Sequence, residues 1–224
     1  MKLYTKTGDN GSSSLYNGSR VSKTSEYFSV LGDLDELNSH IGMSKSYWKA
    51  SPDGDYLPDW DNVGSILTDI QCNIMDISSF IASPAWDLDH PIRGDTTEFI
   101  NKWIDRYGFY NHHITNIETL IDRFDSMLPK LTNFVVPGNN VLVSSLHICR
   151  SVSRRCERSF LKLVESGLVY YGVYNNIDTQ FKNVKIYLNR LSDFLFVFSR
   201  FISMTLDTNE DIYSRSFKNM DINI

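Results

Sequence analysis

Apolar residues recur at alternating steps of three and four along five separate stretches of the chain. This spacing places them along one side of a helix, as in the seams of helical bundles. The five apolar seams run over Val30–Ile41, Val63–Ile81, Ile114–Leu128, Leu142–Leu163 and Val184–Ile202. The strict alternation of a half-buried strand does not occur, apart from ambiguous short pieces such as GLVYYGVY. The pattern therefore predicts an all-α fold, a bundle of five helices.

Proline, glycine and polar residues interrupt the pattern between the five helices. They gather in ASPDGDYLPDW, SPAWDLDHPIRGD, LPKLTNFVVPGNN and YGVYNNID, whose lengths suit an antiparallel bundle. The sequence has no internal repeat and no low-complexity block. We expect a single domain over residues 1–224, with a glycine-rich loop in 1–25, the helical bundle in 26–205 and a polar, partly mobile tail in 206–224.

The composition is that of an ordinary globular protein, with 42% hydrophobic and 22% charged residues. The net charge of −5 argues against nucleic-acid binding, and no apolar run approaches the ~20 residues that span a membrane. The three cysteines show no CxxC spacing and no leader precedes the loop, so we expect reduced thiols and a cytoplasmic protein. The five histidines lack metal-ligand spacing, and no GxSxG or Cys–His arrangement indicates a hydrolase.

The glycine-rich loop contains the stretch YTKTGDNGSSSLYNGSRVSK, from Tyr4 to Lys23. Its glycines let the backbone turn freely, its serines and threonines offer hydroxyls, and its lysines and arginine add positive charge. Neither the Walker A pattern nor GxGxxG occurs in it. On composition alone, a mobile terminus and a phosphate-binding cradle explain this stretch equally well.

The fourth predicted helix contains the stretch HICRSVSRRCERSF. Arg150, Arg154 and Glu157 fall within about 60° of one another beside its apolar seam, with Arg158 slightly further round and Arg155 pointing elsewhere. One interpretation is a solvated face with weak charge pairs, each worth a few tenths of a kcal/mol. The other is an anion clamp, because guanidinium groups bind phosphate oxygens with directional, charge-assisted hydrogen bonds.

Two polar residues lie among apolar neighbours on other helices. Asp35, in LGDLDELNSHIG, follows Leu34 on the first seam, and a carboxylate there is costly unless it is paired. An arginine from the fourth helix is the obvious partner, whereas Asp33 suits the start of a helix through the helix dipole. Asn189, in YLNRLSDFLF, is either a hydrogen-bonded structural residue or a ligand for a metal–phosphate group.

These stretches together resemble the ATP:cob(I)alamin adenosyltransferases of the propanediol-utilisation type. Members of that family carry YTKTGDxGxTxL, DELNSxIG, LHxCRxxxRRxER and NRLSDxLF. Here the four stretches read YTKTGDNGSSSL, DELNSHIG, LHICRSVSRRCER and NRLSDFLF, in the same order from about Lys2 to Arg200. The resemblance implies a five-helix bundle that assembles as a homotrimer, with active sites between neighbouring subunits.

The resemblance also implies a reaction. Co(I) of a reduced corrinoid attacks the 5′ carbon of ATP, which releases triphosphate and yields adenosylcobalamin. Mg²⁺ accompanies the ATP, and a monovalent cation such as K⁺ is a further expected cofactor. A corrinoid reductase and an adenosylcobalamin-dependent mutase are the expected partners.

The matching motif positions imply a role for each candidate residue. The residues expected to contact ATP from the glycine-rich loop are Thr5, Thr7, Gly8, Asp9, Gly11, Ser13, Arg20 and Lys23. Arg150 is expected to pair with Asp35 and fix the subunit interface, while Arg154 holds the triphosphate. Glu157 and Asn189 are expected to orient ATP and its Mg²⁺.

Phe134, in NFVVPG, aligns with an aromatic residue that packs beneath the corrin in family members and excludes a lower axial ligand of cobalt. For a lone phenylalanine in this position, core packing is the simpler interpretation. The chain departs from the family at Asn139, where PGNN replaces PGG, and at Asp33, where a small residue is usual. Members often add an aromatic residue near the C-terminus to the corrin pocket, and Phe217 is the candidate here.

Two other function classes remain open at the level of sequence. A non-catalytic carrier would bind ATP and corrinoid and deliver adenosylcobalamin to a mutase, without releasing triphosphate. A purely structural helical bundle would leave the glycine-rich loop and the Asp35/Arg150 arrangement without a purpose.

Overall fold

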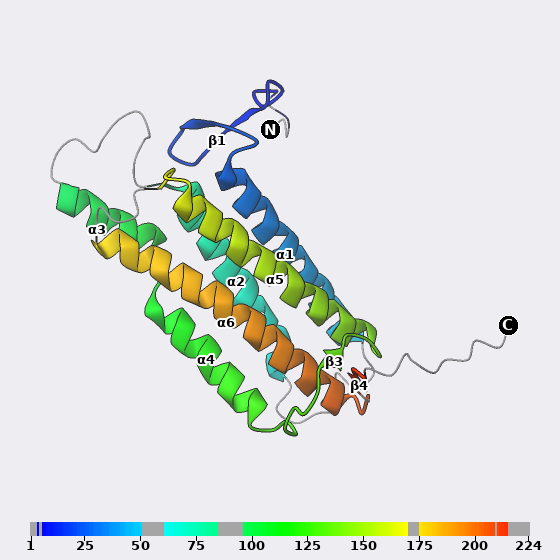
Figure 1. Ribbon diagram of the computed structural model, residues 1–224. Coiled ribbons are helices and arrows are strands. Elements are labelled where there is room, and N and C mark those ends of the chain that lie inside the picture. Colours follow the sequence, from blue (N-terminus) through cyan, green and yellow to red (C-terminus); the bar gives the residue numbers. More distant parts are fainter. Residues whose placement is uncertain are drawn as a thin grey trace.

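The computed structural model describes residue 4 and residues 6–50, 61–84, 96–169, 175–208 and 210–214, and it confirms the five predicted helices. They are α1 (Glu26–Ala50), α2 (Asp61–Ala82), α4 (Asn111–Asp125), α5 (Val141–Glu165) and α6 (Asn175–Thr205). Figure 1 shows them side by side as an elongated bundle. No helix in the described ranges is long and apolar enough to cross a membrane.

The apolar seams form one continuous core. α1 packs against α2 and α5, and α6 packs against α5 and α4. α1 and α5 run antiparallel, because the Tyr27 hydroxyl donates to the Leu168 carbonyl (3.0 Å) near one end and the Ser44 and Ser145 hydroxyls meet (2.9 Å) near the other. Most seam residues are buried, and Ile121 and Leu128 are partly buried against the same core, so the periodicity in the sequence specifies most of the core.

A further helix, α3 (Thr96–Tyr107), lies between the predicted loop SPAWDLDHPIRGD and the third predicted helix, where the sequence pattern predicted no element. Ile100 and Trp103 are buried, and the Trp103 ring packs 5.3 Å from the Phe80 ring. The Trp103 indole N–H also donates to the Ser83 carbonyl at the end of α2 (2.6 Å). α3 therefore caps one end of the bundle beside α2.

Among the described residues, the helices are accompanied by four short strands. The sequence pattern did not predict these strands. β1 (Ser12–Ser14) and β2 (Arg20–Ser22) form an antiparallel hairpin within the glycine-rich loop. β3 (Val135–Val136) pairs with β4 (Asp211–Ile212), so the beginning of the expected tail is held against the segment that precedes α5. Strands of two or three residues are too short for an alternating pattern to be visible.

The two strand pairs lie at opposite ends of the bundle (Figure 1). The hairpin precedes the start of α1 and donates from the Tyr16 amide to the Ala82 carbonyl at the end of α2 (2.8 Å). β3 precedes the start of α5, which lies beside the end of α1. Since α1 contains 25 residues, about 37 Å of helix separates the two ends.

Candidate functional site

The glycine-rich loop folds around one arginine. The Arg20 guanidinium donates to the Thr7 carbonyl (2.6 Å) and to the Ser12 and Ser14 side chains. Gly11 (φ +81°) adopts a left-handed conformation, which glycine reaches without strain, and its carbonyl accepts from the Lys23 amide (2.9 Å). These hydrogen bonds give the described part of the loop a defined backbone conformation.

Most predicted nucleotide contacts in this loop face solvent. Thr7, Asp9, Gly11, Arg20 and Lys23 are exposed, while Gly8 and Ser13 are half-buried. Thr5 lies outside the described residues. The loop thus presents backbone N–H groups, hydroxyls and a lysine on its surface, which is the chemistry that binds phosphate.

Asp35 lies on the same side of the molecule as the hairpin. Together with Tyr16 and residues of α2 it lines a hollow of about 330 Å³ between α1 and α2. The Asp35 side chain is exposed in the single chain. Asp35 and Arg150 make no ion pair with each other within the described chain, and their pairing across a subunit boundary stays a prediction.

The arginine that does pair with α1 is Arg155, which the sequence placed elsewhere. Its Nε donates to Asp33 (3.0 Å), its Nη2 donates to Glu36, and the Ser159 hydroxyl also donates to Asp33. The Arg155 hydrogen bond is the main cause that lowers the pKa of Glu36. Asp33 and Glu36 are three residues apart and face α5, whereas Asp35 is about 200° round the helix from Asp33.

Arg150 and Arg154 are different from Arg155, because no carboxylate of the described chain pairs with them. Arg154 is exposed on α5. Arg150 is half-buried, and its Nε has no hydrogen-bond partner within the described residues. Burial, and then the nearby charge of Arg154, lower the pKa of the Arg150 guanidinium. Two adjacent guanidinium groups without an acid partner form a site for an anion or for a carboxylate from outside the chain.

The structure brings the predicted pair Glu157 and Asn189 together. The Asn189 amide donates to the Glu157 carboxylate (3.0 Å) across α5 and α6. The Asn189 carbonyl accepts from Arg190 (3.0 Å), whose Nε donates to Glu118 on α4 (2.9 Å). Glu118 and Arg190 were not among the predicted site residues, although Arg190 lies next to Asn189 in the same motif.

In this part of the site, Glu157 is the carboxylate that was predicted to bind a metal ion. Within the described ranges, no group of three or more His, Cys, Asp or Glu side chains is placed to hold a metal. Mg²⁺ that is bound mainly through phosphates requires only one or two protein carboxylates. Glu157 can supply one, so the residues present fit Mg²⁺ that arrives with a nucleotide rather than a separate metal centre.

Phe134 is not a core residue. Its side chain is 80% exposed, so the core-packing interpretation is wrong. Its carbonyl accepts from the Tyr213 amide (2.8 Å), and both residues line a shallow hollow of about 310 Å³ with Leu131, Thr132 and Asn133. Phe217 lies outside the described residues. An aromatic ring that is this exposed among the described residues is suited to contact a large flat ligand.

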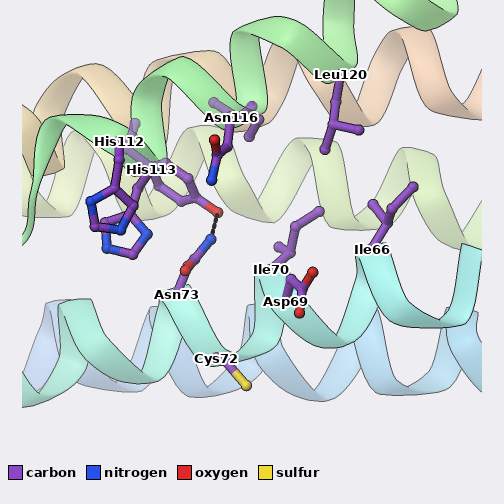
Figure 2. Close-up of a pocket in the computed structure, with 11 residues that line it drawn as sticks. Ile66, Asp69, Ile70, Cys72, Asn73, His112, His113, Asn116 and Leu120 are labelled. Atoms are coloured by element: carbon purple, nitrogen blue, oxygen red, sulfur yellow. Dashed lines mark hydrogen bonds between the residues drawn. The ribbon is translucent and has the colours of Figure 1, made fainter. Parts of the chain in front are cut away.

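Another hollow, of about 250 Å³, lies between α2 and α4 and contains none of the predicted site residues. Figure 2 shows His112, His113 and Asn116 of α4 opposite Asp69, Cys72 and Asn73 of α2. The Asn73 amide donates to the Tyr187 hydroxyl at its base (3.1 Å). This hydrogen bond joins α2 to α6.

Known proteins with similar sequences identify the family of this chain. The sequence profile of the cobalamin adenosyltransferase family matches residues 3–202. The chain belongs to this family. The human corrinoid adenosyltransferase MMAB is 34% identical over 215 residues, covering 96% of this chain and 74% of the human protein. The corrinoid adenosyltransferase of Bacillus subtilis is 30% identical, with 96% and 94% covered.

Solved structures of the family share the fold. A variant PduO-type ATP:corrinoid adenosyltransferase from Lactobacillus reuteri, complexed with cobalamin and ATP, superposes with a TM-score of 0.73 at 24% identity, covering 96% of this chain and 97% of that one. A second variant of the same enzyme, also complexed with cobalamin and ATP, gives 0.72 at 25% identity, with 95% and 99% covered. The helical bundle expected from the resemblance is thereby confirmed.

Proposed function

We propose that this protein transfers the 5′-deoxyadenosyl group of ATP to the Co(I) of a reduced corrinoid. The proposal is carried by a cluster of polar side chains on α5 and α6. In this cluster the Glu157–Asn189 pair lies on the same side of α5 as Arg150 and Arg154, which pair with no carboxylate of the described residues. Membership of the cobalamin adenosyltransferase family indicates that ATP and a corrinoid are the substrates of this cluster.

The chemistry needs no activated protein nucleophile. Co(I) donates an electron pair to the 5′ carbon of ATP, a Co–C bond forms, and the C–O bond to the triphosphate breaks. Burial raises the pKa of Cys149 to about 11 and that of Cys156 to about 12, so neither thiol ionises near neutral pH. The protein's task is to orient ATP, exclude water and stabilise the leaving triphosphate.

Each candidate residue has a part in that task. The Arg154 guanidinium is free to bind the triphosphate oxygens, and the glycine-rich loop offers N–H groups, hydroxyls and Lys23 to the same charge. The Glu157 carboxylate would hold Mg²⁺ that accompanies ATP, and the Asn189 carbonyl would be a weaker ligand because it already accepts from Arg190. The ion would neutralise part of the phosphate charge. K⁺ remains an expected second cation.

The active site forms between subunits of a homotrimer. Asp35 and the hairpin lie on the α1–α2 side, whereas Arg150, Arg154 and Glu157 lie on α5 and face the other way. Two surfaces on different sides of one chain can act on one ligand when neighbouring copies associate head to tail. Such contacts form a ring when the rotation between copies closes. No carboxylate of the described residues pairs with the half-buried Arg150, which suits pairing with Asp35 of a neighbouring copy.

Phe134 contacts the corrinoid face. Its exposed ring can exclude a lower axial ligand, which makes reduction of Co(II) to Co(I) easier. Phe134 lies at the opposite end of the bundle from the hairpin of its own chain, which is a second reason for a site built from more than one copy (Figure 1).

We also propose that the protein is cytoplasmic. Its three cysteines are free thiols, as is usual in reducing compartments. A reductase that supplies reduced corrinoid and a mutase that takes the product are the corresponding partners. The reductase would generate Co(I) before the transfer, and the mutase would use the adenosylcobalamin that the transfer yields.

An anaerobic assay tests the function. Chemically reduced cobalamin and Mg·ATP are added to the protein, and the absorbance change of Co–C bond formation is followed together with release of triphosphate. We expect adenosylcobalamin and triphosphate in equal amounts over many turnovers. Binding of adenosylcobalamin without any release of triphosphate would instead identify a carrier, and no thermal stabilisation by Mg·ATP would identify a structural bundle.

A further inference from the structure

A buried arginine and a half-buried glutamate form an ion pair that contacts the segment leading to Phe134. Arg200, near the end of α6, is only 5% exposed. Its Nε donates to both carboxylate oxygens of Glu210 (3.0 and 3.2 Å), and its Nη2 donates to the Pro129 carbonyl (3.2 Å). A guanidinium keeps its charge under all ordinary conditions, so a buried one depends on these acceptors.

The two groups that Arg200 holds belong to the two segments that meet at Phe134. Glu210 directly precedes β4, and Pro129 begins the loop that leads into β3. β3 and β4 then pair through Val135 with Ile212 and Val136 with Asp211. A single side chain of α6 therefore ties both strands to the bundle.

The position of Phe134 depends on this arrangement. With 80% of its side chain exposed, the ring has little packing to hold it. The fixed elements are its carbonyl, which accepts from the Tyr213 amide (2.8 Å), and the pairing of the next two residues with β4. Two strands of two residues each are too short to stay paired unaided. Whatever fixes β4 therefore also fixes Phe134.

We propose that the Arg200–Glu210 pair is a positioning clamp that holds β4 against β3 and so orients Phe134 toward the corrinoid. The proposal rests on the role given to Phe134 in the proposed function. Arg200 and Glu210 do not touch substrate in it; they act through the backbone of the β3–β4 pair. The clamp concerns the corrinoid half of the site alone, since the nucleotide contacts lie on α5, α6 and the glycine-rich loop.

The test compares Glu210→Ala with Asp211→Ala, which removes the next carboxylate along the chain, an exposed one. Glu210 lies after the helical bundle, so its removal changes no residue of the helices and leaves the Pro129 carbonyl as an acceptor for the Arg200 guanidinium. The Michaelis constants for cob(I)alamin and ATP are measured separately, and hydrogen exchange is followed in peptides that cover residues 130–137 and 210–214. Glu210→Gln, which keeps one acceptor oxygen, is the conservative variant.

For Glu210→Ala we expect the Michaelis constant for cob(I)alamin to rise about tenfold, that for ATP to stay within about twofold, and both peptides to exchange faster. Asp211→Ala should match the wild type, and Glu210→Gln should lie between. Faster exchange with an unchanged constant for cob(I)alamin, unchanged exchange, or a rise in both constants would each overturn the proposal.

A Phe134→Ala variant separates this proposal from the one on which it rests. If Phe134→Ala leaves the kinetics with cob(I)alamin unchanged, the role of Phe134 is wrong, and with it the purpose of the clamp. The exchange data would still decide whether the ion pair holds the two strands together.

Discussion

Neighbouring arginines on α5 have different surroundings, and this difference decides which of them can bind a ligand. Arg155 is engaged by Asp33 and Glu36 of α1 and serves to hold two helices together. Arg158 donates to the carbonyl of Arg154 and is otherwise exposed. Arg154 has an exposed guanidinium beside the Glu157–Asn189 pair, so it is the arginine of this stretch that is available to the triphosphate.

We predict that Arg154→Ala removes one or two charge-assisted contacts to the triphosphate, each worth roughly 1.5–3 kcal/mol. This loss corresponds to a fall of about 10- to 10⁴-fold in turnover with cob(I)alamin and ATP. The matched control is Arg158→Ala, one turn further along the same exposed side, which should stay within about twofold of the wild type. Near-wild-type turnover of Arg154→Ala would contradict the assignment.

His147 makes the stability of the fold depend on pH. It is buried, and burial together with the charge of Arg150 lowers its pKa to about 4 from an ordinary value of 6.5. Between these values the unfolded chain binds the proton and the folded chain does not, so the free energy of unfolding falls as the pH drops from 6.5 toward 4.

In urea titrations we expect His147 to account for about 2 kcal/mol of the stability lost between pH 7 and pH 4.5. A His147→Gln variant removes this titration, so its stability should fall by that much less over the same interval. Other ionisable groups cancel in the difference between the two proteins. Equal losses in both would mean that His147 is protonated in the folded protein.

At the level of elements, the start of α5 depends on two adjacent asparagines with different roles. The Asn140 side chain accepts from the amides of Leu142 and Val143 and caps the helix. Asn139 has φ +72°, the left-handed region that glycine adopts more easily. The family's PGG at this point is thus replaced by a residue that tolerates the same backbone.

We predict that Asn140→Ala lowers the free energy of unfolding by about 1 kcal/mol, because two amides of the first turn lose their acceptor. Asn139→Gly should leave it unchanged or raise it slightly, since glycine fits the same conformation. Chemical denaturation of both variants checks this. A larger loss for Asn139→Gly than for Asn140→Ala would show that the side chain of Asn139 matters more than the cap.

The elements that the sequence predicted well are those whose pattern is local. The seams of α1, α2, α4, α5 and α6 follow from apolar spacing within each helix. The same spacing exists in α3, at Ile100, Trp103 and Tyr107. Because α3 has only 12 residues, its apolar pattern is too short to predict a helix. β3 and β4 join residues far apart in sequence, and strands of two residues carry no periodicity.

The same limit explains what was missed in the candidate site. Periodicity placed Arg150, Arg154 and Glu157 on one side of a helix, and the structure agrees. It could not say which helix that side faces, so the pairing of Arg155 with Asp33 and Glu36 of α1 was not predicted. The exposure of Phe134 and its link to Tyr213 likewise depend on the return of the chain after α6.

At the level of the whole molecule, the predicted site residues of one chain are distributed over separate surfaces. The glycine-rich hairpin and Asp35 lie on the α1–α2 side, and Arg154 lies on α5. In a ring of three copies, the loop of one copy would meet Arg154 of the next, so each of the three sites would draw on two chains. This arrangement can be tested without a structure of the complex.

Two inactive variants should restore activity when they assemble together. Arg20→Ala removes the side chain around which the glycine-rich loop folds, and Arg154→Ala removes the triphosphate contact. The two chains are co-expressed with different tags, and oligomers that contain both are purified by the two tags in turn. In a mixed ring of three, one site joins an intact loop to an intact Arg154, so about one site in three should be active. Oligomers with both tags on a single variant are the control. Activity no higher than theirs would mean that the loop and Arg154 of the same chain serve the same site, because mixing could then never reunite them.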